Sequence, residues 1–377
     1  MKILYIATAN VFVRSGGGIA NLAYYKVFEK LYPNSVDFLI SEDVVVDNNL
    51  VKNVRLVPNR SKFEKIKSLF TGEIHRYKKY VRKILSKEKY DICFINGGHY
   101  AGDMIDLLHE YGVKVIVMNH NFEIEYQSTV KSNFFFKKFF IRHVVKNEHY
   151  SYKKADANCF ITKEDLALFR RAYGETSSIQ KVIGVYDPSK ERIPDYHNRN
   201  NKFTIVISGS VNADQTVDGI RDFHDIYWDV LKNIIPDCKI IITGRNADRL
   251  YTLFPDFSNS NIEVIPNPED IYEVVSKAHL YLCPTNVGGG LKLRVMDGLK
   301  LGLPVLVHKV SSRGYDNFIN KPYFKVYQDK ESFAQGLESL VYYVKNQSGD
   351  FDIRKEYDAE FGIDRGVSLM SDLLKEL

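Results

Sequence analysis

The chain has 377 residues, of which 45% are hydrophobic and 26% charged, with 52 Lys and Arg against 47 Asp and Glu. This composition can fill two packed cores, and it excludes collagen-like, disordered and low-complexity proteins. The four cysteines lie singly in apolar runs, which excludes a disulfide scaffold and indicates a reducing compartment. No apolar run approaches the ~20 residues of a membrane-spanning helix. The N-terminus predicts a first strand rather than a signal peptide, so we expect a cytoplasmic protein.

Short β-rich runs alternate with helical patterns along the first half of the chain. This alternation predicts α/β layers with a parallel sheet. The expected strands are Lys2–Ala7, Val36–Ile40, Ile92–Ile95, Val113–Met118 and Ala157–Ile161, and the expected helices span 19–31, 74–87, 101–111, 134–153 and 163–173. Residues 186–202 are polar and lack periodicity, which is typical of a linker between domains.

The same alternation resumes after the linker. The expected strands are Phe203–Ile207, Lys239–Thr243, Ile262–Ile265, Leu280–Cys283 and Pro304–His308, with helices 216–234, 269–277, 291–301 and a final helix 364–377. We therefore expect two Rossmann-like, doubly wound domains, 1–185 and 203–360, with residues 361–377 packing back on the first. Two such domains facing each other would align the carboxyl ends of both sheets along a cleft, where ligands bind.

The charge is unevenly distributed. Residues 1–185 hold 29 basic and 19 acidic residues, or +10, whereas the remainder holds 23 and 28, or −5. The excess lies in Lys52–Lys89, with 13 basic and 3 acidic residues, and in Lys131–Lys154, with 7 and 1. One interpretation is a solvated basic face above inward-packed aromatic residues. The other is a surface for anionic lipid headgroups or a polyanionic acceptor. No nucleic-acid-binding motif accompanies the charge, so we expect no nucleic acid partner.

The first glycine-rich motif is Gly16, Gly17 and Gly18, between the first strand and the first helix. Glycine lets main-chain N–H groups approach a ligand, and a helix N-terminus favours negative charge, so this junction suits a phosphate or a sugar hydroxyl. It lacks the spacing of a dinucleotide fingerprint and the Gly-Lys-Ser/Thr of a P-loop. A simple tight turn remains the alternative.

The second motif is more informative. Gly288, Gly289 and Gly290 end a strand and open a helix, and Lys292 and Arg294 fall in what we expect to be its first turn. Cations at a helix N-terminus are unfavourable unless an anion lies in front of them, and a pyrophosphate would supply that anion. Asp297 follows Arg294 at i+3 and can accept hydrogen bonds from a ribose diol.

These motifs resemble the retaining nucleotide-sugar glycosyltransferases of the GT-B fold, specifically family 4 and its relatives. That family has a Pro at a strand end, a glycine-rich turn, an acidic residue along the following helix and then Gly-x-Pro-Val, matched here by Pro284, Gly288–Gly290, Asp297 and Gly302–Val305. The Gly16–Gly18 turn is similar to the family's N-terminal glycine loop, and His120 to its active-site histidine. Gly209 and Gly244 match positions where the C-terminal sheet faces the nucleotide.

The sequence also departs from the family pattern. The first carboxylate of the two-acid motif would fall at Gly289, and the second is Asp297 rather than Glu. The Arg and Lys that commonly follow the first strand of the nucleotide domain are absent from Gly209–Thr216. We expect Lys292 and Arg294, supported by Arg245, to supply that charge. The resemblance further implies that the donor site includes Leu291 and that the base lies near Pro266 and Asn267.

A third cluster follows two neighbouring strands of the first domain. A lone histidine at a strand end often has a purely structural role, but His120 precedes two carboxylates at the expected carboxyl edge. We assign His120 to the donor sugar or the reaction centre, and Glu123 or Glu125 to the orientation of an acceptor hydroxyl. Asn96 and His99 end the neighbouring strand and would line the same acceptor site.

The resemblance implies a metal-independent hexosyltransferase. The expected reaction moves a hexosyl-type sugar from a nucleotide diphosphate sugar, with UDP as the expected carrier, to a glycan, lipid-linked or protein-linked acceptor, with retention. This reaction is consistent with surface polysaccharide or glycoconjugate synthesis. The basic segments are compatible with peripheral contact at the inner face of the membrane, and a solvated basic face with a soluble acceptor is equally compatible with them. Two alternatives stay open, which are a nucleotide-sugar 2-epimerase of the same fold and a non-catalytic nucleotide-sugar-binding homologue. The absence of the first acid supports the latter.

Overall fold

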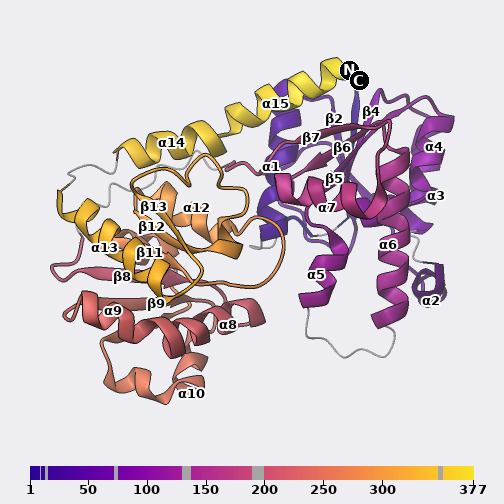
Figure 1. The fold of residues 1–377 in the computed structure, drawn as a ribbon. Helices are drawn as coiled ribbons and strands as arrows, with labels where there is room; N and C mark the ends of the chain where they lie inside the picture. Colours follow the sequence, from indigo (N-terminus) through magenta and orange to yellow (C-terminus); the bar gives the residue numbers. More distant parts are fainter. Residues whose placement is uncertain (9, 13–15, 72–74, 130–136, 189–198, 347–350) are drawn as a thin grey trace. The chain divides into compact units, whose positions relative to one another are not determined.

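The computed structural model describes residues 1–8, 10–12, 16–71, 75–129, 137–188, 199–346 and 351–377. The chain divides into two compact units, Met1–Ser189 with Phe361–Leu377, and Lys190–Glu360. Each unit contains one parallel β-sheet with helices packed against it (Figure 1). Most of the expected linker 186–202 lies outside the described residues.

The sheet of the first unit has strands in the order β3-β2-β1-β4-β5-β6-β7, and all neighbouring pairs are parallel. The strands are β1 Ile3–Ala7, β2 Val36–Ser41, β3 Val54–Val57, β4 Ile92–Asn96, β5 Lys114–Asn119, β6 Ala157–Phe160 and β7 Ile179–Val182. Strand β1 pairs with both β2 and β4, so the winding reverses between β1 and β4. Ligands of doubly wound sheets bind at the carboxyl end of such a switch point.

Helices of the first unit cover both faces of this sheet. They are α1 Gly16–Leu31, α2 Lys62–Thr71, α3 His75–Leu85, η1 Gly98–Tyr100, α4 Met104–Glu110, α5 Glu123–Thr129, α6 Lys137–Lys154, α7 Lys163–Tyr173 and α15 Ile363–Glu376. The C-terminal α15 packs beside α1. The approach is close, because a Cβ atom at Gly366 would lie 2.6 Å from the ring of Tyr186 and 2.8 Å from the Val27 side chain.

The second unit repeats the design with the order β10-β9-β8-β11-β12-β13, again all parallel. Its strands are β8 Thr204–Ser208, β9 Lys239–Gly244, β10 Ile262–Pro266, β11 Leu280–Cys283, β12 Val305–His308 and β13 Phe324–Tyr327. Its switch point lies between β8 and β11. The helices are α8 Asp214–Asp222, η2 Phe223–Tyr227, α9 Trp228–Ile234, η3 Ala247–Arg249, α10 Leu250–Leu253, η4 Pro255–Asn259, α11 Ile271–Ser276, α12 Leu293–Lys300, η5 Lys309–Ser312, α13 Lys330–Asn346 and α14 Phe351–Phe361.

The two parallel sheets confirm the predicted fold class, while several elements differ from the expectation. Strands β3, β7 and β13 and helices α2, α5, α10, α13 and α14 were not predicted. The predicted helix 216–234 is interrupted by a π-helical turn at Phe223–Tyr227. Lys292 is the N-cap of α12 rather than a residue of its first turn. Residues 134–136 of the predicted helix 134–153 lie outside the described part of the chain.

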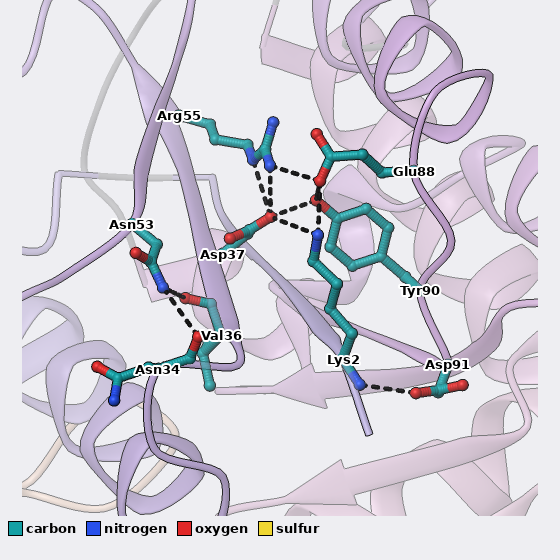
Figure 2. Close-up of polar contacts among 9 residues, drawn as sticks. All are labelled: Lys2, Asn34, Val36, Asp37, Asn53, Arg55, Glu88, Tyr90 and Asp91. Carbon is teal, nitrogen blue, oxygen red and sulfur yellow. Dashed lines mark hydrogen bonds and ion pairs between the residues drawn. The ribbon is translucent and has the colours of Figure 1, made fainter.

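A polar cluster joins the amino ends of the strands in the first unit (Figure 2). Arg55 of β3 donates to Asp37 of β2, with Nε 2.9 Å from Oδ2, and to Glu88, with Nη2 2.7 Å from Oε2. The Lys2 ammonium lies 2.5 Å from the same Glu88 oxygen, and the Tyr90 hydroxyl donates to Asp37. Two cations of the basic first unit are therefore used in holding strands together, at the edge opposite the switch-point loops.

All four cysteines are buried and free. Among the described residues, no helix combines the length and apolar character that crossing a bilayer requires.

Candidate functional site

The carboxyl ends of β8 and β9 meet at two glycines. The N–H of Gly209, just after β8, donates to the carbonyl of Thr243 at 2.9 Å. A Cβ atom at Gly244 would collide with the carbonyl oxygen of Gly209. Both glycines also have positive φ, 156° and 145°. Only glycine fits this close approach of the two strand ends.

The turn after β11 also depends on glycine. Gly288 and Gly290 have φ of 94° and 65°, in the region that favours glycine. A Cβ atom at Gly288 would lie 2.6 Å from the Gln215 side chain of α8. Within the turn, the Lys292 ammonium donates to the carbonyl of Gly289 at 2.9 Å. The turn thus has a fixed conformation, and the buried Lys292 side chain is part of what fixes it.

Arg294 occupies the switch point of the second sheet. Its guanidinium donates to the Thr216 hydroxyl of α8 at 3.0 Å and to the Thr285 hydroxyl after β11 at 3.2 Å. A Cβ atom at Gly209 would lie 2.7 Å from Nη1, so the guanidinium also reaches the end of β8. Hydroxyl groups position a guanidinium without neutralising it. Among the described residues no carboxylate forms an ion pair with Arg294, so its charge is available to an anion at this edge.

The other predicted donor residues lie around the same sheet edge. The side-chain oxygen of Asn267 accepts the main-chain N–H of Asn246 at 3.0 Å. The main-chain N–H of Asn267 donates to the carbonyl of Gly244 at 2.9 Å. Arg245 follows β9 and is exposed, Pro266 ends β10 and is exposed, and Leu291 is half-buried between the glycine turn and α12. Asp297 on α12 accepts a long hydrogen bond, 3.4 Å, from the Tyr272 hydroxyl. The structure therefore brings these residues to the carboxyl side of one sheet.

Of the N-terminal glycine motif, Gly16, Gly17 and Gly18 form the first turn of α1, and the preceding Ser15 lies outside the described residues. The carbonyl of Gly17 accepts the Asn21 amide at 2.7 Å. A Cβ atom at Gly17 would meet nothing within 4 Å. Packing within the fold therefore does not require glycine at position 17. Close approach of a ligand would be a reason for having no side chain there.

A hydrogen-bonded chain runs from this turn to His120. The Tyr5 hydroxyl donates to the Asn21 carbonyl at 2.7 Å and accepts the Asn96 amide at 2.9 Å. The Asn96 side-chain oxygen in turn pairs with Nε2 of His120, which therefore carries the proton. Burial, with a smaller contribution from the nearby His99, lowers the pKa of His120 to about 4, so the ring is neutral at pH 7. The predicted residues Asn96 and His120 are thus partners at adjacent strand ends.

His99 and Glu123 form a second pair beside them. Nδ1 of His99 lies 3.4 Å from Oε1 of Glu123. Burial raises the pKa of Glu123 to about 7, opposed by a hydrogen bond from Gln127, and burial lowers the pKa of His99 to about 4. A carboxyl group with a pKa near neutrality can accept and release a proton at physiological pH. Glu125 lies on the same short helix α5 and is half-buried.

Glu148 of α6 was missed by the sequence analysis. Its Oε2 accepts the N–H of Glu123 at 3.0 Å, and its Oε1 accepts the Tyr173 hydroxyl at 2.7 Å. Burial raises its pKa to about 8. Thr216, Thr285 and Gln215 around Arg294 and the glycine turn were also missed. Of these three residues, only Thr285 was indicated by the sequence. It directly follows Pro284 at the end of a buried strand, where polar residues commonly face a binding site.

Comparisons with known proteins give the family context. Residues 202–342 match the family model described as glycosyl transferases group 1. Structures of similar fold include HepE (Alr3699) of Anabaena in complex with UDP, with 13% identity, a TM-score of 0.70 and 100% of both chains covered. Sucrose-phosphate synthase of Thermosynechococcus elongatus has 11% identity and a TM-score of 0.72, covering 100% of this chain and 98% of that one.

The pneumococcal O-GlcNAc transferase GtfA, solved with UDP and GlcNAc, has 13% identity and a TM-score of 0.65, covering 100% of this chain and 99% of that one. No curated protein sequence matches the chain. The chain has the GT-B fold, and residues 202–342 of its second unit are similar to the glycosyl transferases group 1 family.

Proposed function

We propose that this chain transfers a hexosyl-type sugar from a nucleotide diphosphate sugar, with UDP as carrier, to a glycan, lipid-linked or protein-linked acceptor. The second unit binds the donor and the first unit binds the acceptor. The observation that carries the proposal is the Arg294 guanidinium at the β8–β11 switch point, held by two threonine hydroxyls. The family match of residues 202–342 and the UDP complexes of HepE and GtfA support this choice of donor.

The chemical task of Arg294 is to neutralise the leaving group. As the glycosidic bond breaks, negative charge grows on the diphosphate, and a positioned cation stabilises that charge more in the transition state than in the ground state. The main-chain amides of Gly288–Gly290 would add hydrogen bonds to the same phosphates. Lys292 acts mainly through the turn, since its ammonium already donates to Gly289. Asp297 would hold the ribose, and Pro266 and Asn267 the base.

The first unit supplies the acceptor side of the proposal. Neutral His120 would hydrogen-bond the donor sugar through its second ring nitrogen, while Asn96 fixes the ring orientation through Nε2. Glu123, with its pKa near 7, would accept a proton from the acceptor hydroxyl, and His99 and Glu125 would orient that hydroxyl. We propose retention of configuration, with a role in surface polysaccharide or glycoconjugate synthesis at the cytoplasmic face of the membrane.

We propose that the reaction needs no metal, because Arg294 and the glycine amides provide the positive potential that a divalent ion would otherwise give. The corresponding measurement is donor turnover in EDTA compared with Mg²⁺ and Mn²⁺. Unchanged turnover in EDTA supports the proposal, and restoration of activity by an added metal contradicts it.

The decisive assay offers a panel of UDP- and GDP-sugars with and without mixed glycan acceptors. Sugar transfer to an acceptor supports the transferase. Conversion of the donor to its 2-epimer without acceptor would identify the epimerase instead. Nucleotide binding with neither reaction would identify a non-catalytic binding protein, the candidate that Gly289 favours because it stands where the family has its first carboxylate.

A further inference from the structure

Helix α2 has an apolar face that points to solvent. Phe63, Ile66 and Phe70 are 75%, 54% and 61% exposed, although the apolar face of a helix usually packs against the core. Their spacing of three and four residues places all three on one side of the helix. Exposed apolar residues that gather on one face indicate an interaction surface, whereas single ones are ordinary.

Lysines border this apolar face on both sides. Lys67 lies one turn from Phe63, and Lys62 lies one turn from Ile66, so the two cations flank the stripe. The helix as a whole holds three lysines and one glutamate, or +2. That glutamate is used locally. Glu64 accepts the N–H of Ser61 at 2.8 Å while its own N–H donates to the Ser61 hydroxyl at 3.2 Å, which is a reciprocal helix cap.

Neighbouring helices add more positive charge. Helix α2 contacts α3 and α6 (Figure 1). Both neighbours carry exposed cations, namely Lys79, Arg82 and Lys83 on α3 and Arg142 and Lys146 on α6. These residues belong to the two basic segments of the sequence, whereas Arg55 of the first segment is held in the strand cluster of Figure 2. Exposed cations of both basic segments therefore lie on α2 and on the two helices that it contacts.

We propose that α2 is an interfacial helix that lies on an anionic lipid bilayer, with Phe63, Ile66 and Phe70 inserted among the headgroups. A helix of ten residues is about 15 Å long, which is too short to span a bilayer but suited to lie along it. Apolar burial and attraction to anionic lipids act together in such binding. The lysine border favours lipid over protein, because the centres of protein interfaces are depleted in lysine.

The proposed lipid contact of α2 identifies the part of the chain that would meet the membrane in the proposed function. It rests on that proposed function only for the reason why the protein would bind a membrane. Lipid binding by α2 needs no sugar donor, so it is measured independently. The test uses the full chain and sedimentation with vesicles of phosphatidylcholine alone or of equal parts phosphatidylcholine and phosphatidylglycerol. UDP affinity and thermal unfolding are measured on the same preparations, which separates failure of lipid binding from failure of the transferase assignment or of folding.

The wild-type chain should sediment with the anionic vesicles and not with the neutral ones. Replacing Phe63 and Phe70 by Ser should lower the partition coefficient at least about tenfold, and Lys62→Gln with Lys67→Gln should lower it about tenfold. Tyr342→Ser on α13, where the side chain is 71% exposed, is the matched apolar control, and Lys330→Gln with Lys345→Gln the matched charge control. Both controls should bind as the wild type does.

Three results would overturn the proposal. The first is failure of the wild-type chain to bind anionic vesicles. The second is binding of the α2 variants at the wild-type level. The third is a loss of binding in the Tyr342 control as large as the loss in the Phe63 and Phe70 variant. Formation of a dimer that the Phe63 and Phe70 changes dissociate, with no vesicle binding, would assign the face to a second copy of the chain instead.

Discussion

The Lys292 ammonium donates a hydrogen bond to the main-chain carbonyl of Gly289, three residues earlier, at 2.9 Å. This contact closes the glycine turn that precedes α12. The Tyr315 hydroxyl donates to the carbonyl of Lys292 itself at 2.8 Å, so the N-cap residue is held from both its side chain and its main chain. The Lys292 ammonium therefore stabilises the conformation of the turn and also adds positive potential at the same site.

Lys292→Met should therefore loosen the turn and lower the free energy of unfolding by about 1–3 kcal/mol, since the Gly289 carbonyl loses a charged donor. UDP affinity should fall roughly tenfold through the lost field and the altered amides. Urea unfolding and isothermal titration measure the two effects. Lys277→Met, at an exposed position on the same unit, is the control and should change neither. An unchanged unfolding free energy in Lys292→Met would contradict the role in the turn.

Gly17→Ala separates ligand contact from folding. Because a Cβ atom there meets nothing within 4 Å, the free energy of unfolding should stay the same or rise slightly. If a substrate approaches the start of α1, the added methyl group should lower transfer roughly tenfold by displacing it. Thermal unfolding and initial rates test this pair of outcomes. Full activity in this variant would show that the N-terminal glycine motif is only a turn.

Glu123 predicts a specific pH dependence. Its pKa is raised from 4.5 to about 7, so the folded state favours the protonated carboxyl. The resulting stabilisation is present below pH 4.5 and is lost as the pH rises through about 7. Glu123→Gln should flatten the fall in unfolding free energy between pH 5 and 8 that urea titrations show for the wild type. Glu148 contributes in the same direction, so the Glu123→Gln curve should keep some slope. Identical curves for variant and wild type would disprove the shift.

The same variant should alter catalysis. If the ionised carboxylate accepts the proton of the acceptor hydroxyl, the wild-type transfer rate should rise with pH through about 7. Glu123→Gln should lower transfer about a hundredfold or more and remove that rise, while UDP affinity stays unchanged. Initial rates across the pH range, with UDP titration alongside, check this. A pH profile that the substitution does not alter would exclude Glu123 as the base.

The strand cluster of Figure 2 makes a prediction about stability alone. Arg55→Met would leave the buried Asp37 carboxylate with fewer donors and should lower the free energy of unfolding by about 2–3 kcal/mol. Folded Arg55→Met should keep wild-type UDP affinity and transfer, because the cluster lies at the amino ends of the strands. Loss of transfer without loss of stability would show instead that this part of the basic segment meets the acceptor.

The sequence predicted the buried strands well and the edge strands poorly. Strands such as Ile3–Ala7 and Ile92–Asn96 are buried at every position and are apolar except at Asn96, because both faces of the strands are covered. The missed β3, β7 and β13 each have four residues, and all include half-buried positions with charged or polar side chains. Their pattern differs little from that of a loop, and only pairing with a neighbouring strand identifies them.

The site was predictable where one segment carries it. Gly288–Gly290 and Arg294 are close in the sequence, so a local pattern was enough to predict that they lie together at one sheet edge. The partners of Arg294 were not predictable, because Thr216 is 78 residues away in the sequence and reaches the guanidinium only through the winding of the sheet. Tyr5 and Asn21 were missed for the same reason, since their link to Asn96 exists only when β1 and β4 are neighbours.

The most direct test of the account is UDP binding by Arg294→Met, measured by isothermal titration against the wild type and against Arg221→Met, an exposed arginine of α8 that pairs with Asp218. We expect at least about a hundredfold weaker binding for Arg294→Met, equivalent to the loss of a charge-assisted bidentate contact, and wild-type affinity for the control. Equal affinity of the Arg294 variant and the wild type would contradict the account.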